Sequence, residues 1–296
     1  MRKSTQNHVR DLLRSNKLHA KKRFGQNYLL DDNILQKIVK ASKVAPDSNV
    51  IEIGPGLGSL TRYLVEASKT LLAYEIDTDL SEILLDMFSD REDFSLRSTD
   101  FLKVDIAKDI VETFGDVYGV TVVANLPYYI TTPIIMKCLE NSQRLSRMVF
   151  MMQNEVAQRL SAVPNTKAYN ALSVMIQYKT NTTYEFKVPR TVFLPAPDVD
   201  SAIISMDIIP RKERPAKDED FLFDFVRQAF KQKRKTLINN LHAAYQIAKA
   251  DIREFLHEQG YKETLRAEGI TVEEFVDLSE ACRGGISIVL CGTATR

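Results

Sequence analysis

Short apolar runs alternate with helical patterns along the chain from about residue 31 to residue 153. The apolar runs lie near residues 50–53, 70–74, 94–97, 121–125 and 147–152. Such alternation is typical of a mostly parallel sheet with helices on both faces. It therefore predicts an α/β fold built on a doubly wound, Rossmann-like domain.

The remainder of the chain divides by charge and periodicity. Residues 1–17 predict a basic helix, and the stretches 183–188 and 202–208 predict an edge hairpin of the sheet. After a charged linker at 210–215, the patterns up to residue 283 are helical, which predicts a second, smaller all-α domain. We therefore expect an amino-terminal segment over 1–30, the sheet domain over 31–209, the helical domain over 210–283 and an unassigned tail over 284–296.

Four successive strands of the predicted sheet end on residues suited to a nucleotide-like ligand. The first runs into the loop Gly54-Pro55-Gly56-Leu57-Gly58, and the next three are followed by Glu75, Asp100 and Asn125. Because ligands of open α/β sheets bind at the carboxyl ends of the strands, we expect these residues to line one crevice. Glycines allow the backbone to approach a ligand, and an acid about 20 residues later can accept hydrogen bonds from ribose hydroxyls.

The spacing of the glycines differs from that of a dinucleotide-binding site. The dinucleotide fingerprint is G-x-G-x-x-G, whereas this chain has E-x-G-x-G-x-G over Glu52 to Gly58. A dehydrogenase is therefore disfavoured.

The run Asn125-Leu126-Pro127-Tyr128 ends a buried strand in a form that suits a planar amine. Asn125 provides a side-chain carbonyl, and Pro127 has no backbone N–H that would compete with the amine as a donor. Tyr128 provides a flat face on which a base can stack. A proline turn with core aromatics is the structural alternative.

The formal net charge of +1 hides a segregation of charge. Residues 1–24 contain eight Lys or Arg and one Asp, and residues 25–210 carry an excess of acidic side chains. A second basic cluster, Lys231, Lys233, Arg234 and Lys235, lies between two helical patterns. Beside a base-sized pocket, these clusters indicate contact with RNA phosphates, whereas a solvated helix face is the other interpretation of the second cluster.

The cysteines and histidines limit which disulfide or metal sites the chain can have. Three scattered cysteines give no disulfide framework, and four dispersed histidines without paired cysteines predict no metal site. The sequence has no signal peptide and no apolar run long enough to span a membrane. We expect a cytoplasmic protein that acts as a monomer.

In this order and spacing, the motifs resemble the rRNA adenine dimethylase family, and within it the KsgA-type enzymes of the small ribosomal subunit (16S rRNA). Two positions depart from the family pattern, with Tyr28 in place of Phe and Thr99 in place of Gly. The resemblance is carried by residues 22–29 with Asp31, the Glu52 to Gly58 loop, Glu75, Asp100-Phe101, Asn125 to Tyr129 with Thr132-Pro133, and Phe193 to Ser201.

The resemblance implies a class I methyltransferase that uses S-adenosyl-L-methionine, releases S-adenosyl-L-homocysteine and needs no metal. It also implies that residues 18–30 form a lid over the cofactor. The implied cofactor-binding residues are Asn27, Leu29, Gly54, Gly56, Glu75, Ile76, Asp100, Phe101 and Asn125. The implied catalytic residues are Asn125, Leu126, Pro127 and Tyr128. The implied contacts to the base and the RNA are Tyr128, Phe193, Pro195, Lys22, Arg23, Lys231, Lys233, Arg234 and Lys235.

The implied reaction is dimethylation of the exocyclic amines of two adjacent adenosines, in a hairpin loop near the 3′ end of small-subunit rRNA. The substrate would be the rRNA or an assembling 30S subunit, with a role in subunit biogenesis. Two alternatives remain: a 23S rRNA methyltransferase of the macrolide-resistance type, and a non-catalytic RNA-binding assembly factor on the same fold. The long basic amino-terminal helix and the Phe193 to Ser201 motif favour the small-subunit enzyme.

Overall fold

The computed structural model describes residues 4–16, 25–209 and 215–285. These residues form two compact units. The first contains the described residues up to Ala157 and those from Thr180 to the end of the sheet, and the second contains Gln158–Lys179 and residues 215–285. Lys22, Arg23 and residues 286–296 of the predicted tail lie outside the described residues.

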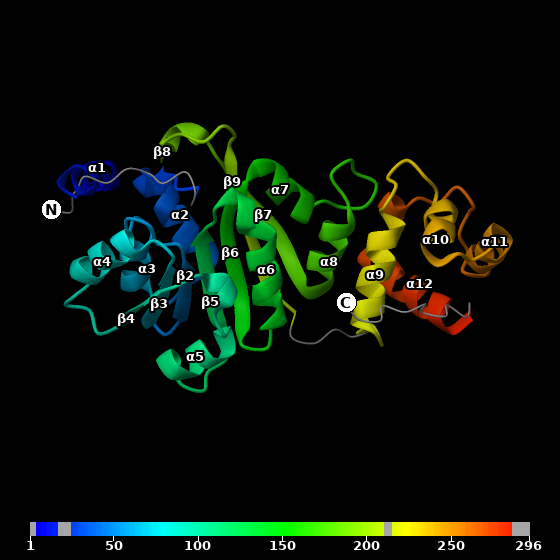
Figure 1. The fold of residues 1–296 in the computed structure, drawn as a ribbon, viewed down its shortest axis with the longest axis horizontal. Helices are drawn as coiled ribbons and strands as arrows, with labels where there is room; N and C mark the ends of the chain where they lie inside the picture. The colour runs from blue at the N-terminus through cyan, green and yellow to red at the C-terminus, as the bar shows by residue number, and fades with distance from the viewer. Residues whose placement is uncertain (1–3, 17–24, 210–214, 286–296) are drawn as a thin grey trace. The chain divides into compact units, whose positions relative to one another are not determined.

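The first unit is built on a seven-stranded sheet of order β4-β3-β2-β5-β6-β9-β7. Strands β4, β3, β2, β5 and β6 are parallel, and β9 is antiparallel to both of its neighbours. Figure 1 shows these strands with the helices that connect them. The strands are β2 (Asn49–Ile53), β3 (Thr70–Glu75), β4 (Phe94–Ser98), β5 (Val120–Asn125), β6 (Leu145–Gln153), β7 (Thr180–Val188) and β9 (Ser201–Ile208).

Helices pack on both faces of this sheet, as the alternating pattern predicts. Leu35 of α2 and Leu64 of α3 pack in one buried cluster with Val50 and Val123 of the sheet. On the other side, the Tyr74 hydroxyl of β3 donates to Asp109 of α5 at 2.8 Å. The helices are α1 (Thr5–Ser15), α2 (Asp32–Ser42), α3 (Thr61–Ala67), α4 (Thr78–Met87), α5 (Ile106–Phe114) and α6 (Thr131–Glu140). Helix α7 (Asn154–Leu160) begins in the first unit and ends in the second, because the division falls after Ala157.

Aspartates at strand-to-helix turns fix where these helices begin. The side chains of Asp31, Asp77 and Asp105 accept hydrogen bonds from backbone N–H groups in the first turns of α2, α4 and α5. Each such cap typically stabilises a helix by about 1 kcal/mol. The turns at the carboxyl ends of the strands are thereby held in place.

The antiparallel end of the sheet contains the predicted edge hairpin. Strands β7 and β9 do pair with each other, but β9 lies inside the sheet, between β6 and β7. Seven of the eight residues of β9 are buried, whereas β7 carries exposed residues along its length. A strand covered on both faces is buried at almost every residue rather than at alternate ones, and this burial marks β9 as an interior strand.

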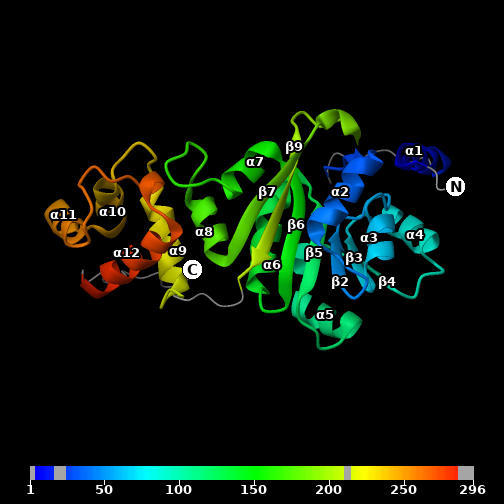
Figure 2. The ribbon, with the colours of Figure 1, turned by 180° about the vertical axis from the view of Figure 1, so that it is seen from behind.

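The second unit is helical, and Figure 2 shows its helices from behind. Phe225 of α9, Leu241 of α10, Leu256 of α11 and Phe275 of α12 belong to one buried cluster. The helices are α8 (Ala171–Lys179), α9 (Glu219–Ala229), α10 (Leu237–Tyr245), α11 (Lys249–Glu258) and α12 (Val272–Gly285).

Residues 158–179 belong to this helical unit, although we expected them in the sheet domain. Tyr169, Val174 and Tyr178 are buried in the helical cluster, and the Tyr169 hydroxyl donates to the backbone carbonyl of Ile270. The helical unit is therefore assembled from two separate stretches of the chain. Sequence order alone does not reveal this arrangement, because the stretch follows directly on the last parallel strand.

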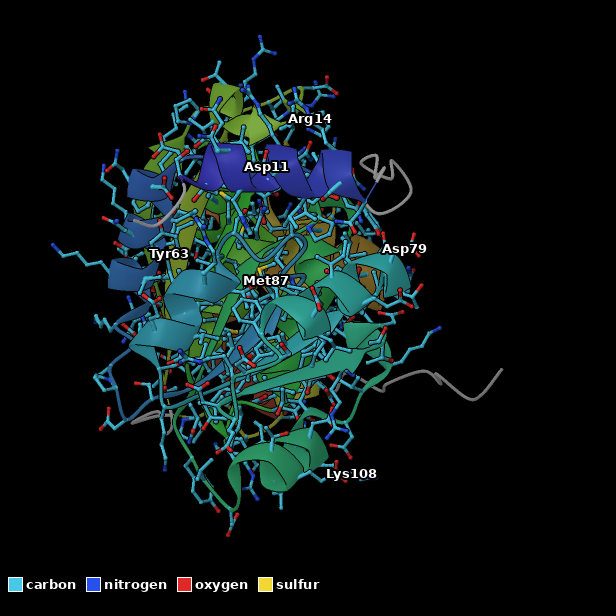
Figure 3. All side chains as sticks on the ribbon, turned by 90° about the vertical axis from the view of Figure 1, so that its left-hand side faces the viewer. Asp11, Arg14, Tyr63, Asp79, Met87 and Lys108 are labelled. Atoms are coloured by element: carbon cyan, nitrogen blue, oxygen red, sulfur yellow. The ribbon has the colours of Figure 1, made fainter. Side chains whose placement is uncertain are left out.

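A short two-stranded sheet and helix α1 complete the first unit. Strand β1 (Tyr28–Leu29) pairs antiparallel with β8 (Phe193–Leu194). Val9 of α1 is fully buried and packs in a cluster with Tyr28, Leu57 and Leu80. Figure 3 shows α1, which carries the labelled Asp11 and Arg14, above the helices that carry Tyr63 and Met87. The predicted basic helix is thus present over residues 5–15.

Candidate active site

A single pocket lies at the carboxyl ends of the parallel strands. It contains about 1160 Å³ of empty space, with open solvent at its mouth included. Gly54, Glu75, Asp100 and Asn125 all line it, each from the end of a different strand. The structure therefore brings together the four strand ends that the sequence singled out.

The glycine loop after β2 leaves open space beside the backbone. Gly54 has a φ of +69°, and a Cβ atom at this position would have no other atom within 4 Å. Gly56 has a φ of +61°, and its missing Cβ leaves room for the Tyr28 ring, whose Cε1 would lie 3.4 Å away. Since L side chains rarely adopt such φ values, glycine is required at both positions.

The Glu75 carboxylate closes this loop against the end of β3. Its Oε2 accepts the backbone N–H of Gly56 at 3.0 Å, and its Oε1 accepts the N–H of Asp77 at 2.9 Å. Burial raises the pKa of Glu75 above its usual value, and these hydrogen bonds oppose that effect. A carboxylate offers about four acceptor positions, so Glu75 can still accept further hydrogen bonds.

Asp100, Phe101 and Ile76 form a neighbouring wall of the pocket. The Asp100 Oδ1 accepts the Leu102 N–H at 3.0 Å, which begins the short helix η2 (Phe101–Lys103). The Phe101 ring packs edge-on against Tyr74, with ring centroids 5.2 Å apart. Ile76 is 47% exposed, so an apolar surface faces the ligand space beside a carboxylate.

The Asn125 carboxamide has a defined orientation. Its Nδ2 donates to the backbone carbonyl of Asn27 at 3.1 Å. An amide nitrogen can donate to a carbonyl and the amide oxygen cannot, so this contact identifies which atom is Nδ2. The Oδ1 of Asn125 is therefore the atom available as an acceptor in the pocket.

The turn after Asn125 is held by neighbouring elements. The Leu126 N–H donates to the Met151 carbonyl of β6 at 3.1 Å. The Tyr128 hydroxyl lies 2.7 Å from the Ser201 Oγ at the start of β9, which fixes the ring of this half-buried side chain. Thr131 Oγ1 donates to the carbonyls of Pro127 and Tyr128 at 3.3 Å. Carbonyl, amide and aromatic groups thus meet on a rigid turn beside the glycine loop.

Comparison with known proteins identifies the family. The model of the family "Ribosomal RNA adenine dimethylase" matches residues 17–283. The chain belongs to this family. The ribosomal RNA small subunit methyltransferase A of Lactococcus lactis subsp. lactis is 45% identical over 277 residues, which are 92% of this chain and 93% of that protein. The same-named protein of Streptococcus pneumoniae is 45% identical over 267 residues, or 89% and 92% of the two chains.

Two solved structures share the fold of this family member. A dimethyladenosine transferase from Plasmodium falciparum has a TM-score of 0.72 at 24% identity, covering 86% of this chain and 97% of that one. The 23S rRNA methyltransferase ErmE has a TM-score of 0.68 at 23% identity, covering 86% and 98%. The predicted class I methyltransferase fold is confirmed.

Two polar residues of the pocket were given no binding role by the sequence, although one of them opens the glycine motif. Glu52 and Ser59 line the pocket and are buried. Among the described residues, the Glu52 Oε2 and the Ser59 Oγ have no hydrogen-bond partner. Buried polar atoms are normally paired, so these two are the atoms that a polar ligand would satisfy. The acid that opens the E-x-G-x-G-x-G motif was the available signal for Glu52.

The Glu52 carboxyl gives a pH-dependent contribution to stability. Burial, with the nearby charge of Glu75, raises its pKa to about 8 from the ordinary 4.5. The folded chain then retains a proton that the unfolded chain releases above pH 4.5, so stability falls from that pH up to about pH 8. We expect the Glu52→Gln variant to lack this decline, with a stability advantage over the wild type that grows between pH 5 and pH 8. Urea unfolding at pH 5, 6.5 and 8 measures it, and a difference that does not change with pH would contradict it.

The structure places the predicted RNA contacts at several locations. Phe193 is buried in β8, where it pairs with Leu29, and Pro195 is exposed after that strand. The four basic residues of the second cluster are exposed on the helical unit. Neither group lines the pocket.

Over the part of the chain that the structure describes, no group of three or more His, Cys, Asp or Glu is placed to hold a metal ion. In the same residues, no helix is long and apolar enough to cross a membrane.

Proposed function

We propose that this chain transfers methyl groups from S-adenosyl-L-methionine to the exocyclic amines of two adjacent adenosines near the 3′ end of small-subunit rRNA. One observation carries the proposal. The Asn125 amide presents an oriented acceptor in the same pocket as the Gly54 loop and Glu75. The names of the related proteins from Lactococcus lactis and Streptococcus pneumoniae support the small subunit over the large one.

The pocket fits the cofactor in its chemistry. Open space beside Gly54 suits the amino-acid end, which Glu52 and Ser59 can hydrogen-bond through their unpaired buried atoms. Glu75 suits the ribose hydroxyls, and Asp100 suits the adenine amino group. When bound, the cofactor supplies an electrophilic methyl group. The residues that would hold it are Asn27, Leu29, Gly54, Gly56, Glu75, Ile76, Asp100, Phe101 and Asn125.

The protein's own contribution is the placement of a weak nucleophile. The lone pair of an adenine amine is delocalised into the ring. The Asn125 Oδ1 and the backbone carbonyl of Leu126 accept the two amine hydrogens, which favours a pyramidal nitrogen with an available lone pair. Ordering two reactants in this way can account for roughly 7–11 kcal/mol of a barrier. Pro127 keeps a competing N–H out of the turn.

Tyr128 receives the target base. A base must leave its stack before its amine can enter a pocket, which costs a few kcal/mol. Stacking on an aromatic ring contributes about 1–3 kcal/mol and offsets part of this cost. The hydrogen bond between Tyr128 and Ser201 holds the ring in place for stacking.

The exposed basic cluster of the helical unit contacts RNA phosphates. Its loop is ordered by the buried Asn240, which donates to the carbonyls of Ala229 and Gln232 and accepts the Gln232 N–H. Lys233 also donates to the Lys167 carbonyl at 2.6 Å. A fixed loop presents its charges to a phosphate backbone with little further ordering.

We expect a variant with Lys231→Gln, Lys233→Gln and Lys235→Gln to bind small-subunit rRNA more weakly, because phosphate contacts release counterions. The slope of log affinity against log salt should fall in magnitude by about 2–3. A matched control removes three exposed lysines from the first unit, Lys43, Lys69 and Lys108. Equal effects of the two variants, measured by filter binding at several salt concentrations, would contradict a specific role for the cluster.

The direct test of the reaction is to incubate the protein and labelled cofactor with unmodified small and large ribosomal subunits, and then to map the modified nucleoside. Label in dimethyladenosine near the 3′ end of small-subunit rRNA is the expected result. Label confined to large-subunit RNA would overturn the assignment. Cofactor binding without label in either RNA would indicate a non-catalytic assembly factor. We further propose that the protein acts in the cytoplasm as a monomer, with an assembling 30S subunit as its substrate.

A further inference from the structure

We propose that residues 25–29, here called the strap, position the Asn125 carboxamide, and that a hydrogen bond between Gln26 and Asp77 latches the strap in place. The inference rests on the proposed function, since it assigns positioning residues to that reaction. A strap with this role does more than cover a cofactor. It determines which atom of Asn125 faces the adenine amine.

The first contacts of the strap are with Asp77, which lies next to the predicted cofactor-binding residues Glu75 and Ile76. The Gln26 Nε2 donates to the Asp77 Oδ2 at 2.9 Å, and the Gln26 Oε1 accepts the Tyr28 hydroxyl at 3.0 Å. Both ends of the Gln26 amide therefore have partners that fix its orientation. Asp77 is itself tied to the pocket, because its N–H donates to the Glu75 carboxylate. Through Asp77, the latch thus connects the strap to Glu75, the carboxylate that suits the ribose hydroxyls.

The second contacts are with the turn that receives the base. The Asn27 carbonyl accepts the Asn125 Nδ2 at 3.1 Å, and the Asn27 Nδ2 donates to the Gly25 carbonyl at 3.1 Å. A Cβ at Gly25 would lie 3.4 Å from the Tyr129 ring and 3.5 Å from Pro127 Cβ. The strap therefore lies directly against this turn.

The third contacts are with β8 and the residue before it, in the segment that the resemblance assigns to contacts with the base. Tyr28 pairs with Leu194 and Leu29 with Phe193, and the Leu30 N–H donates to the Val192 carbonyl at 2.9 Å. The strap therefore contacts Asp77 beside Glu75, the turn after Asn125, and β8. These are the three parts that must be in register for one methyl transfer.

The Asn27 carbonyl has a specific chemical consequence. A carboxamide has two faces of similar size, and rotation by 180° exchanges its oxygen and its NH₂ group. With the NH₂ group toward an adenine amine, two donors would oppose each other, and a buried donor left unpaired is destabilising. The Asn27 carbonyl removes this alternative, because it accepts a hydrogen bond only from the nitrogen. Displacing the strap should therefore lower the rate of transfer even with cofactor bound.

A reversal of the latch tests this inference. The Gln26→Glu variant replaces the donor to Asp77 with an acceptor at the same position, so two carboxylates face each other. Adding Asp77→Asn restores a hydrogen bond of opposite polarity, and asparagine remains a good cap for α4. Gln36→Glu, on the exposed surface of α2, is the matched charge control.

At saturating cofactor and RNA, we expect Gln26→Glu to lower kcat about tenfold or more, with the KM for RNA within twofold of the wild type. The double variant should return to within about threefold of Asp77→Asn alone, and Gln36→Glu should match the wild type. Hydrogen exchange of the strap amides, with S-adenosyl-L-homocysteine bound, should be faster in Gln26→Glu and slow again in the double variant.

Two results would overturn the inference: an unchanged kcat in Gln26→Glu, or an equal loss in the single and double variants. The rates are measured on whichever subunit RNA the wild-type protein methylates, so an error in the proposed substrate leaves this test intact. The exchange measurement requires no activity, and unchanged strap exchange in Gln26→Glu would exclude the latch by itself.

Discussion

Replacing Asn125 with alanine should strongly reduce the rate of methyl transfer while leaving the protein folded. The variant loses the Oδ1 acceptor that holds the adenine amine, and the loss of one oriented group at a reacting centre typically lowers kcat by about 100- to 1000-fold. The hydrogen bond from Nδ2 to the Asn27 carbonyl is also lost, which costs about 1 kcal/mol of stability. A single-turnover assay on unmodified small subunits, together with thermal unfolding, measures both effects.

A matched control is Asn141→Ala, which removes an equivalent side chain at the end of α6. The Asn141 Nδ2 donates to the Lys137 carbonyl, and the residue does not line the pocket. This variant should keep full activity. Near-wild-type turnover by a folded Asn125→Ala protein would exclude the proposed mechanism.

The second large effect is expected at Gly54. An alanine there must adopt a φ of +69°, and its methyl group would occupy the open space that we assign to the cofactor. We expect affinity for S-adenosyl-L-homocysteine to fall about a hundredfold, which corresponds to about 2.8 kcal/mol. Isothermal titration calorimetry provides the measurement.

The control variant Gly119→Ala distinguishes a loss of cofactor space from backbone strain. Gly119 has a φ of +80°, a Cβ there would also meet no atom within 4 Å, and it does not line the pocket. Gly119→Ala should therefore lose similar stability but no cofactor affinity. Equal affinity losses in the two variants would show that strain, not the pocket, causes the effect.

The parts of the site that follow from the strand pattern alone lie at the ends of apolar runs. Glu75 and Asn125 each end a buried strand, and parallel pairing places such ends at one edge of a sheet. The identity of each side chain and its position on a strand were enough to predict that it lies in the pocket. The same reasoning gives the order of α/β elements without any long-range contact.

Other features depend on contacts between distant residues and have no local pattern. Gln26 and Asp77 meet only after folding, and an exposed-looking glutamine before a strand gives no sign of a carboxylate partner. The interior position of β9 and the packing of Tyr169 with the helical unit are of the same kind. Glu52 was present in the motif, but its burial without a partner for Oε2 is visible only in the folded structure.

The pairing of β1 with β8 has a consequence for protein synthesis. Tyr28 leaves the ribosome early, and its partner Leu194 is made only after five parallel strands of the sheet. Contacts between residues so far apart form late, because the chain between them must first be ordered. A nascent or truncated chain that lacks β8 therefore has no partner strand for β1. Such a chain has the glycine loop and the acids of the pocket, but this strand pairing cannot close them until β8 has been made.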